Sequence, residues 1–292
     1  MNPEPTPLDS GWIAAHALPV HGGGTDKNSR GRVLAIGGSA LSPGAIRLTG
    51  EAALRVGSGK VQIATLASAA MPLGLMVPEA GIVPLSEAAG EIGDVGDALD
   101  VALGGADAIV VGPGMVDRDG ATRLTRLVAE RAGAEAGLLL DATAIACATG
   151  VGDALEPYAG RLVLTPHHGE MAALTGRSVD DIAADPAAAA RAAAEHHGAV
   201  VVLKTSDTLI AAPDGTLLHY AGGGVGLATG GSGDVLAGAI AGLLSRGADP
   251  LVAAGWGVWL HGHSGRRMAA RHGPIGFLAR ELLTEMPLLL PQ

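Results

Sequence analysis

The sequence of 292 residues has few of the features that mark secreted or disulfide-bonded proteins. Its single cysteine is Cys147, so no disulfide can form within the chain and nothing favours an oxidising compartment. Aromatic residues make up only 2% of the sequence, whereas glycine occurs 46 times. The core must therefore be built from aliphatic side chains in closely packed layers, and glycine must set much of the backbone geometry.

Cationic residues and long apolar runs are also scarce. The chain has 19 Lys and Arg against 29 Asp and Glu, a formal charge of −10, which opposes general nucleic-acid binding because counterion release needs a basic surface. No run approaches the roughly 18 apolar residues of a membrane-spanning helix. The N-terminus is rich in proline and acidic residues and lacks the basic-then-apolar order of a signal peptide. We therefore expect a cytoplasmic protein that binds neither nucleic acid nor membranes.

Hydrophobic residues make up 48% of the chain, and after a lead to about residue 30 that we expect to be irregular, β-branched runs alternate with alanine-rich stretches. This alternation is typical of βαβ units around a parallel sheet that helices cover on both faces. The turn residues 213–215 predict a hairpin, and with it an antiparallel sheet edge. Nothing marks a linker, so we expect one domain over residues 1–292. The expected strands are 32–36, 60–66, 107–111, 137–140, 161–164, 199–203 and 207–212, and the expected helices are 44–57, 119–133, 168–175, 186–198, 232–246, 249–271 and 276–284.

The strongest local signal is the glycine-rich segment 222–234, which leads into the helix expected at 232–246. Glycines that open a helix expose unpaired N–H groups and the positive end of the helix dipole, so the loop predicts a seat for phosphate. Asp234 stands in the first turn, where we expect its carboxylate to be kept ionised and to accept a proton from a hydroxyl beside the phosphate. The alternative is that Asp234 only interacts with the dipole and that the glycines form a surface loop.

Segment 165–170, Thr-Pro-His-His-Gly-Glu, lies where an expected strand ends and a helix begins. Parallel sheets bind ligands at this edge. The two histidines and Glu170 are not spaced as zinc ligands are. We interpret His167 as a substrate contact and Glu170 as a residue that acts through water or Mg²⁺ near phosphates. The alternative is that they cap the N-terminus of the helix.

Three further strand ends carry glycine, serine or threonine, which allow a nucleotide to approach the backbone closely. They are segments 37–45, 112–115 and 204–208, each of which alone would be an ordinary connection. His261 and His263 stand two residues apart in the helix expected at 249–271. Because side chains at that spacing diverge around a helix, we interpret them as packed helix residues rather than ligands.

In order and spacing, these segments resemble the ADP/ATP-dependent NAD(P)H-hydrate dehydratases of the ribokinase-like superfamily, over about residues 21–285. The resemblance implies an α/β fold: a three-layer αβα sandwich with a mostly parallel central sheet and without a large lid. It also implies a hydro-lyase that uses ADP or ATP, with Mg²⁺, to restore NADH or NADPH from the hydrated form, and we expect a homo-oligomer. The segments that carry the resemblance are 31–39, 42–45, 50–57, 111–114, 140–142, 165–170, 203–205 and 230–234.

The resemblance also implies a role for individual residues. Asp234 matches the acid/base position beside the substrate hydroxyl. Residues that match substrate positions are Ala45, Gly112, Gly114, His167 and Asp234. Residues that match nucleotide positions are Lys204, Thr205, Ser206, Asp207, Thr208, Gly230, Gly231, Ser232 and Gly233. The chain departs from the family's frequent pattern at Thr143, His168 and Gly224.

The chemistry agrees with these residues independently. Hydroxide leaves a ring carbon poorly whereas a phosphorylated hydroxyl leaves readily, and phosphoryl transfer needs positioning, an anion hole and a base rather than a protein nucleophile. The same residues would serve a small-vitamin or sugar kinase of the superfamily, which is the alternative. His167 separates the two, because the related kinases resemble Thr-Pro-Asn-x-x-Glu at this place. A nucleotide-binding regulatory protein without turnover is a third class, which the presence of Asp234 disfavours.

Overall fold

The structure, a computed structural model, describes residues 4–20, 22, 26, 27 and 29–291. Its central sheet contains a hairpin at one end and parallel strands elsewhere. The strands are β1 (Thr6–Pro7), β2 (Arg32–Ile36), β3 (Lys60–Leu66), β4 (Gly81–Leu85), β7 (Ala108–Val111), β8 (Gly137–Leu140), β9 (Leu162–Leu164), β10 (Ala199–Lys204), β11 (Thr208–Ala211) and β12 (Leu217–Tyr220), with a separate small sheet of β5 (Glu87–Ala88) and β6 (Glu91–Ile92).

The strand order is β1-β12-β11-β10-β9-β8-β7-β2-β3-β4. The pairs β10–β11 and β11–β12 are antiparallel, which confirms the hairpin, and the other neighbours in this sheet are parallel. Because strands β2, β3 and β7 to β10 all point the same way, their carboxyl ends share one edge of the sheet.

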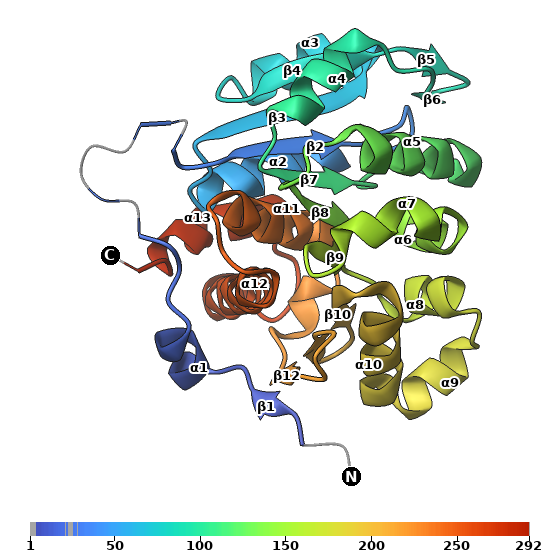
Figure 1. Cartoon of the computed structure of the whole chain (residues 1–292). Helices are drawn as coiled ribbons and strands as arrows, with labels where there is room; N and C mark the ends of the chain where they lie inside the picture. Colours follow the sequence, from blue (N-terminus) through green and yellow to red (C-terminus); the bar gives the residue numbers. More distant parts are fainter. Residues whose placement is uncertain (1–3, 21, 23–25, 28, 292) are drawn as a thin grey trace.

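Helices cover both faces of the sheet (Figure 1). Helices α2, α11 and α12 lie on one face, and α5, α8 and α10 lie on the other. The helices are α1 (Ser10–Ala15), α2 (Ala45–Arg55), α3 (Ala67–Met76), α4 (Asp97–Gly104), α5 (Arg118–Arg131), α6 (Thr143–Cys147), α7 (Gly152–Leu155), α8 (His168–Thr175), α9 (Val179–Ala184), α10 (Pro186–His197), α11 (Ser232–Ser245), α12 (Pro250–His272) and α13 (Ala279–Glu285), with short 3-10 segments at Ala148–Val151, Glu156–Tyr158, Val225–Leu227 and Met286–Leu288.

Alternate residues of the strands enter two separate cores, as strand geometry requires. In β2, for example, Val33 and Ala35 belong to the core beneath α2 and α11, whereas Leu34 and Ile36 belong to the core on the opposite face. The expected three-layer αβα sandwich is therefore present. Among the described helices, none combines the length and apolarity that crossing a membrane requires.

The N-terminal lead is not irregular throughout, so that expectation is wrong. Residues Thr6–Pro7 form β1, which pairs in parallel with β12. Asp9 caps α1, because its Oδ1 accepts hydrogen bonds from the N–H groups of Gly11 at 2.8 Å and Trp12 at 3.0 Å. The proline-rich composition hid a strand of two residues and a helix of fewer than two turns.

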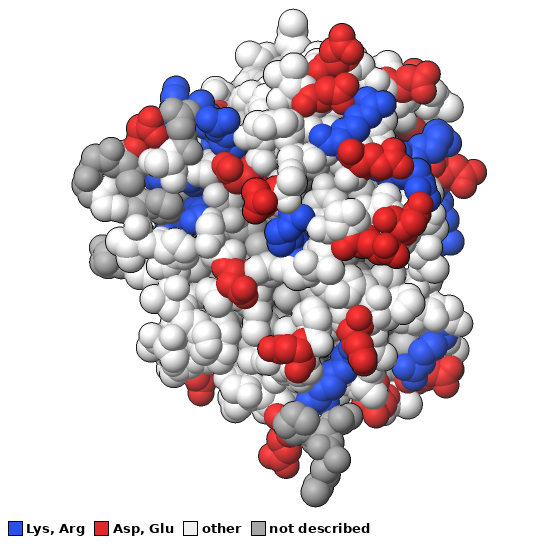
Figure 2. Space-filling model, viewed as in Figure 1, with Lys and Arg blue, Asp and Glu red and all other residues white. Residues whose placement is uncertain are grey.

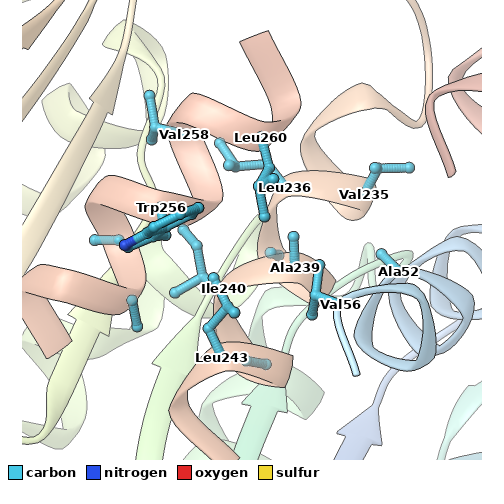
Figure 3. Packing of buried hydrophobic residues seen from close by; sticks show 14 of the residues in the cluster. Ala52, Val56, Val235, Leu236, Ala239, Ile240, Leu243, Trp256, Val258 and Leu260 are labelled. Atoms are coloured by element: carbon cyan, nitrogen blue, oxygen red, sulfur yellow. The ribbon is translucent and has the colours of Figure 1, made fainter. Parts of the chain in front are cut away.

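Helix α11 is held between α2 and α12 by close contacts at glycine. A Cβ on Gly238 would lie 2.1 Å from the carbonyl oxygen of Thr49 in α2, and one on Gly257 of α12 would lie 2.5 Å from Cγ1 of Ile240. Figure 3 shows the side chains of α11 and α12 interlocking around Ile240, with Ala52 of α2 and Val56, the residue that follows α2, close by. These contacts fix the position of α11, whose first residues are the end of the glycine-rich segment.

Candidate functional site

Four charged side chains belong to the carboxyl edge near β8, β9 and β10. Lys204 at the end of β10 places its Nζ 2.9 Å from Oδ1 of Asp141 and 3.7 Å from Oε2 of Glu170. The hydroxyl of Thr165 donates to the same Asp141 oxygen at 2.7 Å. The glycine loop adjoins this pair, because a Cβ on Gly233 would lie 3.4 Å from Lys204 Nζ. The structure therefore brings together a strand end and a glycine loop that are far apart in the sequence.

Asp234, in the first turn of α11, is the fourth charged residue. Burial raises the pKa of Asp234 to about 6; Asp141 and Glu170 reinforce this shift and Lys204 opposes it. At this pKa the carboxylate is still mostly ionised near neutral pH, as expected, but lost hydration and two neighbouring carboxylates make it a stronger base than a free aspartate. A carboxyl with a pKa near neutrality can both take and return a proton, which suits general acid/base catalysis.

Lys204 carries a positive charge at the centre of this group. Burial alone would lower the pKa of Lys204, but Asp141 and Glu170 outweigh it and the pKa is raised. On the face seen in Figure 2, basic side chains are interspersed with acidic ones and form no continuous patch. An anionic ligand at this edge would therefore be attracted by a local cation rather than by a broad basic field.

The glycine loop opens α11 without a side-chain cap. The N-cap is Gly231, whose φ of 89° lies in the left-handed region that glycine adopts without strain. An anion can take the place of a missing cap, since the first N–H groups of a helix have no partner within it. The next residue, Ser232, is buried and places its Oγ 2.9 Å from Nε2 of His261.

Residues 204–208 form a tight turn between β10 and β11. The N–H of Thr205 donates to the carbonyl of Asp207 at 3.0 Å, and Thr208 pairs with Lys204. The Asp207 carboxylate lies 2.9 Å from Nε2 of His219 on β12. A Cβ on Gly222 would lie 3.3 Å from the carbonyl oxygen of Ser206, so this turn adjoins the start of the glycine-rich segment.

The loops after β2 and β7 pack against each other at the same edge. The N–H of Gly38 donates to the carbonyl of Pro113 at 2.8 Å. Gly114 has a φ of 76°, and a Cβ on it would lie 3.0 Å from Cβ of Ala45. A Cβ on Gly112 would lie 1.9 Å from the carbonyl oxygen of Asp141. Ala45, Gly112 and Gly114 are thus gathered beside the charged group.

A cavity of about 730 Å³ lies beside this edge, walled by α2, α3 and α13, by part of loop 37–45 and by Gly230. Its walls are mostly apolar, and Arg47 and Arg280 also line it. A Cβ on Gly231 would lie 2.5 Å from Cδ1 of Leu48, a wall residue, and 3.9 Å from Oδ2 of Asp234. One glycine therefore separates the cavity from the Asp234 carboxylate.

His167 and Glu170 form a capping box at the start of α8. Nδ1 of His167 accepts hydrogen bonds from the N–H groups of Gly169 at 2.9 Å and Glu170 at 3.2 Å, and Glu170 Oε2 accepts from the N–H of His167 at 2.8 Å. The capping alternative is therefore present. Both residues still lie at the site, because His167 forms a parallel bridge with Lys204 and its side chain is 58% exposed.

No group of three or more His, Cys, Asp or Glu in the described part of the chain is arranged to hold a metal ion. One oxygen of Glu170 is already occupied by the capping hydrogen bond. A role for Glu170 toward Mg²⁺ through water therefore stays a prediction.

Two residues that contact these groups were not predicted as site residues. Asp141 directly follows β8, and the signal that could have identified it is its position at a strand end. The next residue, Ala142, has a φ of 51°, a strained value for a residue other than glycine, and such strain is common at functional sites. The sequence favours a packed role for His261, whereas in the structure its ring contacts Ser232 of the glycine-rich segment.

The three residues at which the chain departs from the family pattern lie in different structural environments. The hydroxyl of Thr143 donates to the carbonyl of Met115 at 2.6 Å and so braces loop 112–115. Nε2 of His168 is buried and has no hydrogen-bond partner in the described part of the chain. A Cβ on Gly224 would meet nothing within 4 Å. Thr143 is therefore the one of the three with a clear contact to a predicted substrate loop.

Comparison with known proteins identifies relatives of this chain. A sequence model for NAD(P)H-hydrate dehydratase matches residues 33–288. An ADP-dependent (S)-NAD(P)H-hydrate dehydratase of Xanthomonas campestris is 45% identical over 280 residues, which cover 95% of this chain and 93% of that protein.

Longer relatives and a solved structure extend the comparison. A bifunctional NAD(P)H-hydrate repair enzyme of Moorella thermoacetica is 38% identical over 97% of this chain, which spans 53% of that longer protein. The ADP/ATP-dependent NAD(P)H-hydrate dehydratase of Bacillus subtilis, co-crystallised with ATP and Mg²⁺, superimposes with a TM-score of 0.79 at 28% identity, covering 97% of this chain and 96% of that one.

Proposed function

Because the chain belongs to the NAD(P)H-hydrate dehydratase family, we propose that it restores NADH or NADPH from the hydrated dinucleotide, with ADP or ATP as phosphoryl donor. The observation that carries the proposal is the Asp234 carboxyl, whose pKa is raised to about 6 beside a charged lysine and an uncapped helix N-terminus. A kinase needs the same three parts, but the family to which the chain belongs favours the hydro-lyase reaction.

In this reaction, Asp234 takes the proton of the ring hydroxyl while the terminal phosphoryl group moves to that oxygen. Lys204 and the N–H groups of the glycine loop stabilise the charge that develops on the phosphoryl oxygens. Phosphate then leaves with the electron pair of the C–O bond, and loss of a proton from the neighbouring ring carbon restores the double bond. The protein needs no covalent nucleophile.

The adenine nucleotide lies across the turn 204–208 with its phosphates toward Gly230–Gly233. The support is that the Lys204 ammonium lies close to Gly233, since a Cβ on that glycine would be 3.4 Å from Nζ. A cation and an array of backbone N–H groups are therefore available to the same phosphates. A crystal soaked with a nonhydrolysable analogue tests this arrangement. Phosphates at residues 37–44 instead would overturn it.

The hydrated dinucleotide lies along Ala45, Gly112, Gly114 and His167, with its reacting ring at Asp234. Small residues leave room for it, and the adjoining cavity of about 730 Å³ is large enough for one end of a dinucleotide. Mg²⁺ would accompany the nucleotide phosphates, with Glu170 acting through water.

The deciding experiment is incubation with hydrated NADH or NADPH, ADP or ATP, and Mg²⁺. The expected result is recovery of the dihydronicotinamide absorbance, with Asp180→Asn as an active control from an exposed position on α9. Pyridoxal, hydroxymethylpyrimidine and ribose are tested in parallel for phosphorylation. Rapid phosphorylation of one of these without recovery of absorbance would transfer the assignment to the kinase alternative.

The chain also forms a homo-oligomer in this proposal, as a single folded domain in each copy. The support is α3, where Met71 is 77% exposed and Leu75 is 79% exposed although both are apolar. Light scattering of the purified protein, compared with Met71→Lys and Leu75→Lys, tests it. A wild-type monomer would contradict the proposal.

A further inference from the structure

His261 of α12 is the one imidazole that touches the glycine loop among the described contacts. Its Nε2 lies 2.9 Å from the hydroxyl oxygen of Ser232, the first residue of α11. Ser232 is 5% exposed, and the hydrogen bond to His261 is its one side-chain partner among the described residues. The Ser232 hydroxyl therefore lies in the loop proposed to hold phosphate. The protonation of the imidazole determines the direction in which the hydroxyl proton can point.

The packing of α12 leaves His261 little freedom to move away. One turn earlier, Gly257 packs closely against Ile240 of α11: a Cβ on Gly257 would lie 2.5 Å from Cγ1 of Ile240. On the following residue, Gly262, a Cβ would lie 2.3 Å from Cε1 of Tyr220. The backbone on both sides of His261 is thus held by neighbouring elements, which fixes the ring relative to Ser232.

The ring is neutral at physiological pH. Burial lowers the pKa of His261 to about 4; a hydrogen bond with the backbone of Ser232 opposes the shift and the charge of Lys204 reinforces it. A neutral imidazole carries one N–H and one acceptor nitrogen. Only two arrangements of the contact with Ser232 are therefore possible.

The two arrangements differ in what they offer to a phosphate. If Nε2 lacks a proton, the serine hydroxyl must donate to it, and only oxygen lone pairs face the anion. If Nε2 carries the proton, it donates to the serine oxygen, and the hydroxyl proton is free to donate to a phosphate oxygen. A phosphate accepts hydrogen bonds and repels lone pairs, so the second arrangement fits the site.

We infer that His261 is a positioning residue, which donates from Nε2 to the Ser232 hydroxyl and thereby turns that hydroxyl toward the phosphate held by Gly230–Gly233. The inference rests on the proposed function, since the phosphate belongs to the ADP or ATP proposed to bind there. It adds a residue of α12 to a site otherwise built from strand ends and the first turns of α8 and α11.

The test compares four variants by the affinity of the nonhydrolysable analogue AMP-PNP with Mg²⁺, together with kcat and KM for dehydration. Ser232→Ala and His261→Leu should each weaken analogue binding by about 10- to 100-fold, the range for a hydrogen bond to a charged group. His261→Gln, whose amide N–H reaches close to the position of Nε2, should restore most of the affinity. The double variant Ser232→Ala with His261→Leu should be no weaker than either single one.

His263→Leu is the matched control. It removes another imidazole of α12, one that contacts Tyr220 and the carbonyl of Trp259 and not the glycine loop. This control should bind the analogue as the wild type does, and melting temperatures of all the variants show whether a loss reflects unfolding.

The inference would be overturned if Ser232→Ala bound the analogue with wild-type affinity. It would also be overturned if the fold-losses in analogue affinity of the two single variants multiplied in the double variant. The nitrogen NMR shifts of the ring provide a second readout that needs no activity: protonation at Nε2 supports it, and protonation at Nδ1 would overturn it. If the wild type binds the analogue but does not dehydrate the hydrated dinucleotide, the proposed function fails while these measurements still decide the role of His261.

Discussion

The two ends of the carboxyl edge differ in how they are built. Beside β8 and β10, Lys204 is held by Asp141 and Glu170 through ion pairs of 2.9 and 3.7 Å, and the loop before α11 is set by glycine. Beside β2 and β3, the cavity between α2, α3 and α13 has mostly apolar walls. The first region is specified by charge and backbone geometry, the second by shape.

This difference separates the chemistry from substrate selection. Charge pairs around Asp234 determine whether a proton can be exchanged, so small changes there alter the rate. An apolar cavity contributes area and volume, so changes there alter which ligand fits and how tightly it binds. Substitutions in the two regions should therefore affect different kinetic constants.

The largest effect is expected from Asp234→Asn, in the charged region. Turnover should fall by on the order of 100-fold or more, because the general base is lost, while affinity for the nucleotide stays nearly unchanged. Turnover and nucleotide affinity are measured side by side, with Asp180→Asn as the control. Near-normal turnover would remove Asp234 from the catalytic role.

A paired change in pH dependence tests the coupling within the charged region. Asp234 must be ionised to act as base, so kcat/KM should rise with pH through about 6 in the wild type. Asp141 raises the pKa of Asp234 and Lys204 lowers it. Asp141→Asn should therefore move the acid limb to lower pH, and Lys204→Met should move it to higher pH.

The shift in each variant should be on the order of one pH unit. Lys204→Met should also lower the melting temperature, since Asp141 is left buried without its cation. If the pH profiles of kcat/KM were identical in both variants and the wild type, the acid limb would not reflect the ionisation of Asp234.

The cavity is tested by Ala69→Phe, which fills part of it from α3. KM for the hydrated dinucleotide should rise on the order of 10-fold by loss of space, while KM for ADP or ATP stays the same. Val101→Phe on α4, where Val101 is 79% exposed, is the control for adding an aromatic ring. A rise in the nucleotide KM instead would mean that the two regions are not separable.

The smallest effect is expected outside both regions, from Gly176→Ala at the C-terminal end of α8. Gly176 has a φ of 70° and free space around it, so the change should cost about 1 kcal/mol of backbone strain without a clash. Denaturant unfolding measures this, and kcat should be unaffected. Gly133→Ala, at a position with neither a positive φ nor a close neighbour, should leave stability within a few tenths of a kcal/mol.

Much of the fold could be predicted because the parallel strands are buried on both faces. Segments such as 137–140 and 199–203 are continuous apolar runs, and Gly176 and Gly198 end their helices in the left-handed conformation as expected of such glycines. The region 67–104 was missed because its signals conflict. Helix α3 contains Pro72 and Gly74, and β4 contains Pro84, residues that argue against regular structure.

The site was predictable to the extent that its groups lie in short segments. Local spacing alone predicts an anion site or a helix cap at two places, the loop 230–234 and the segment 165–170. The cavity could not be predicted, because its walls join residues from α2, α3 and α13 that carry no shared pattern. The raised pKa of Asp234 could not be predicted either, because it depends on burial and on Asp141 and Glu170, which only the folded chain brings near it.

The short strand β1 has a consequence for the solubility of the molecule. It occupies the open side of β12, the last strand of the hairpin that follows the turn 204–208. An uncovered strand edge can recruit a strand from another chain and start aggregation. Residues Thr6–Pro7 therefore cover that edge of β12. Pro7 has no backbone N–H, so it cannot donate a hydrogen bond to an incoming strand.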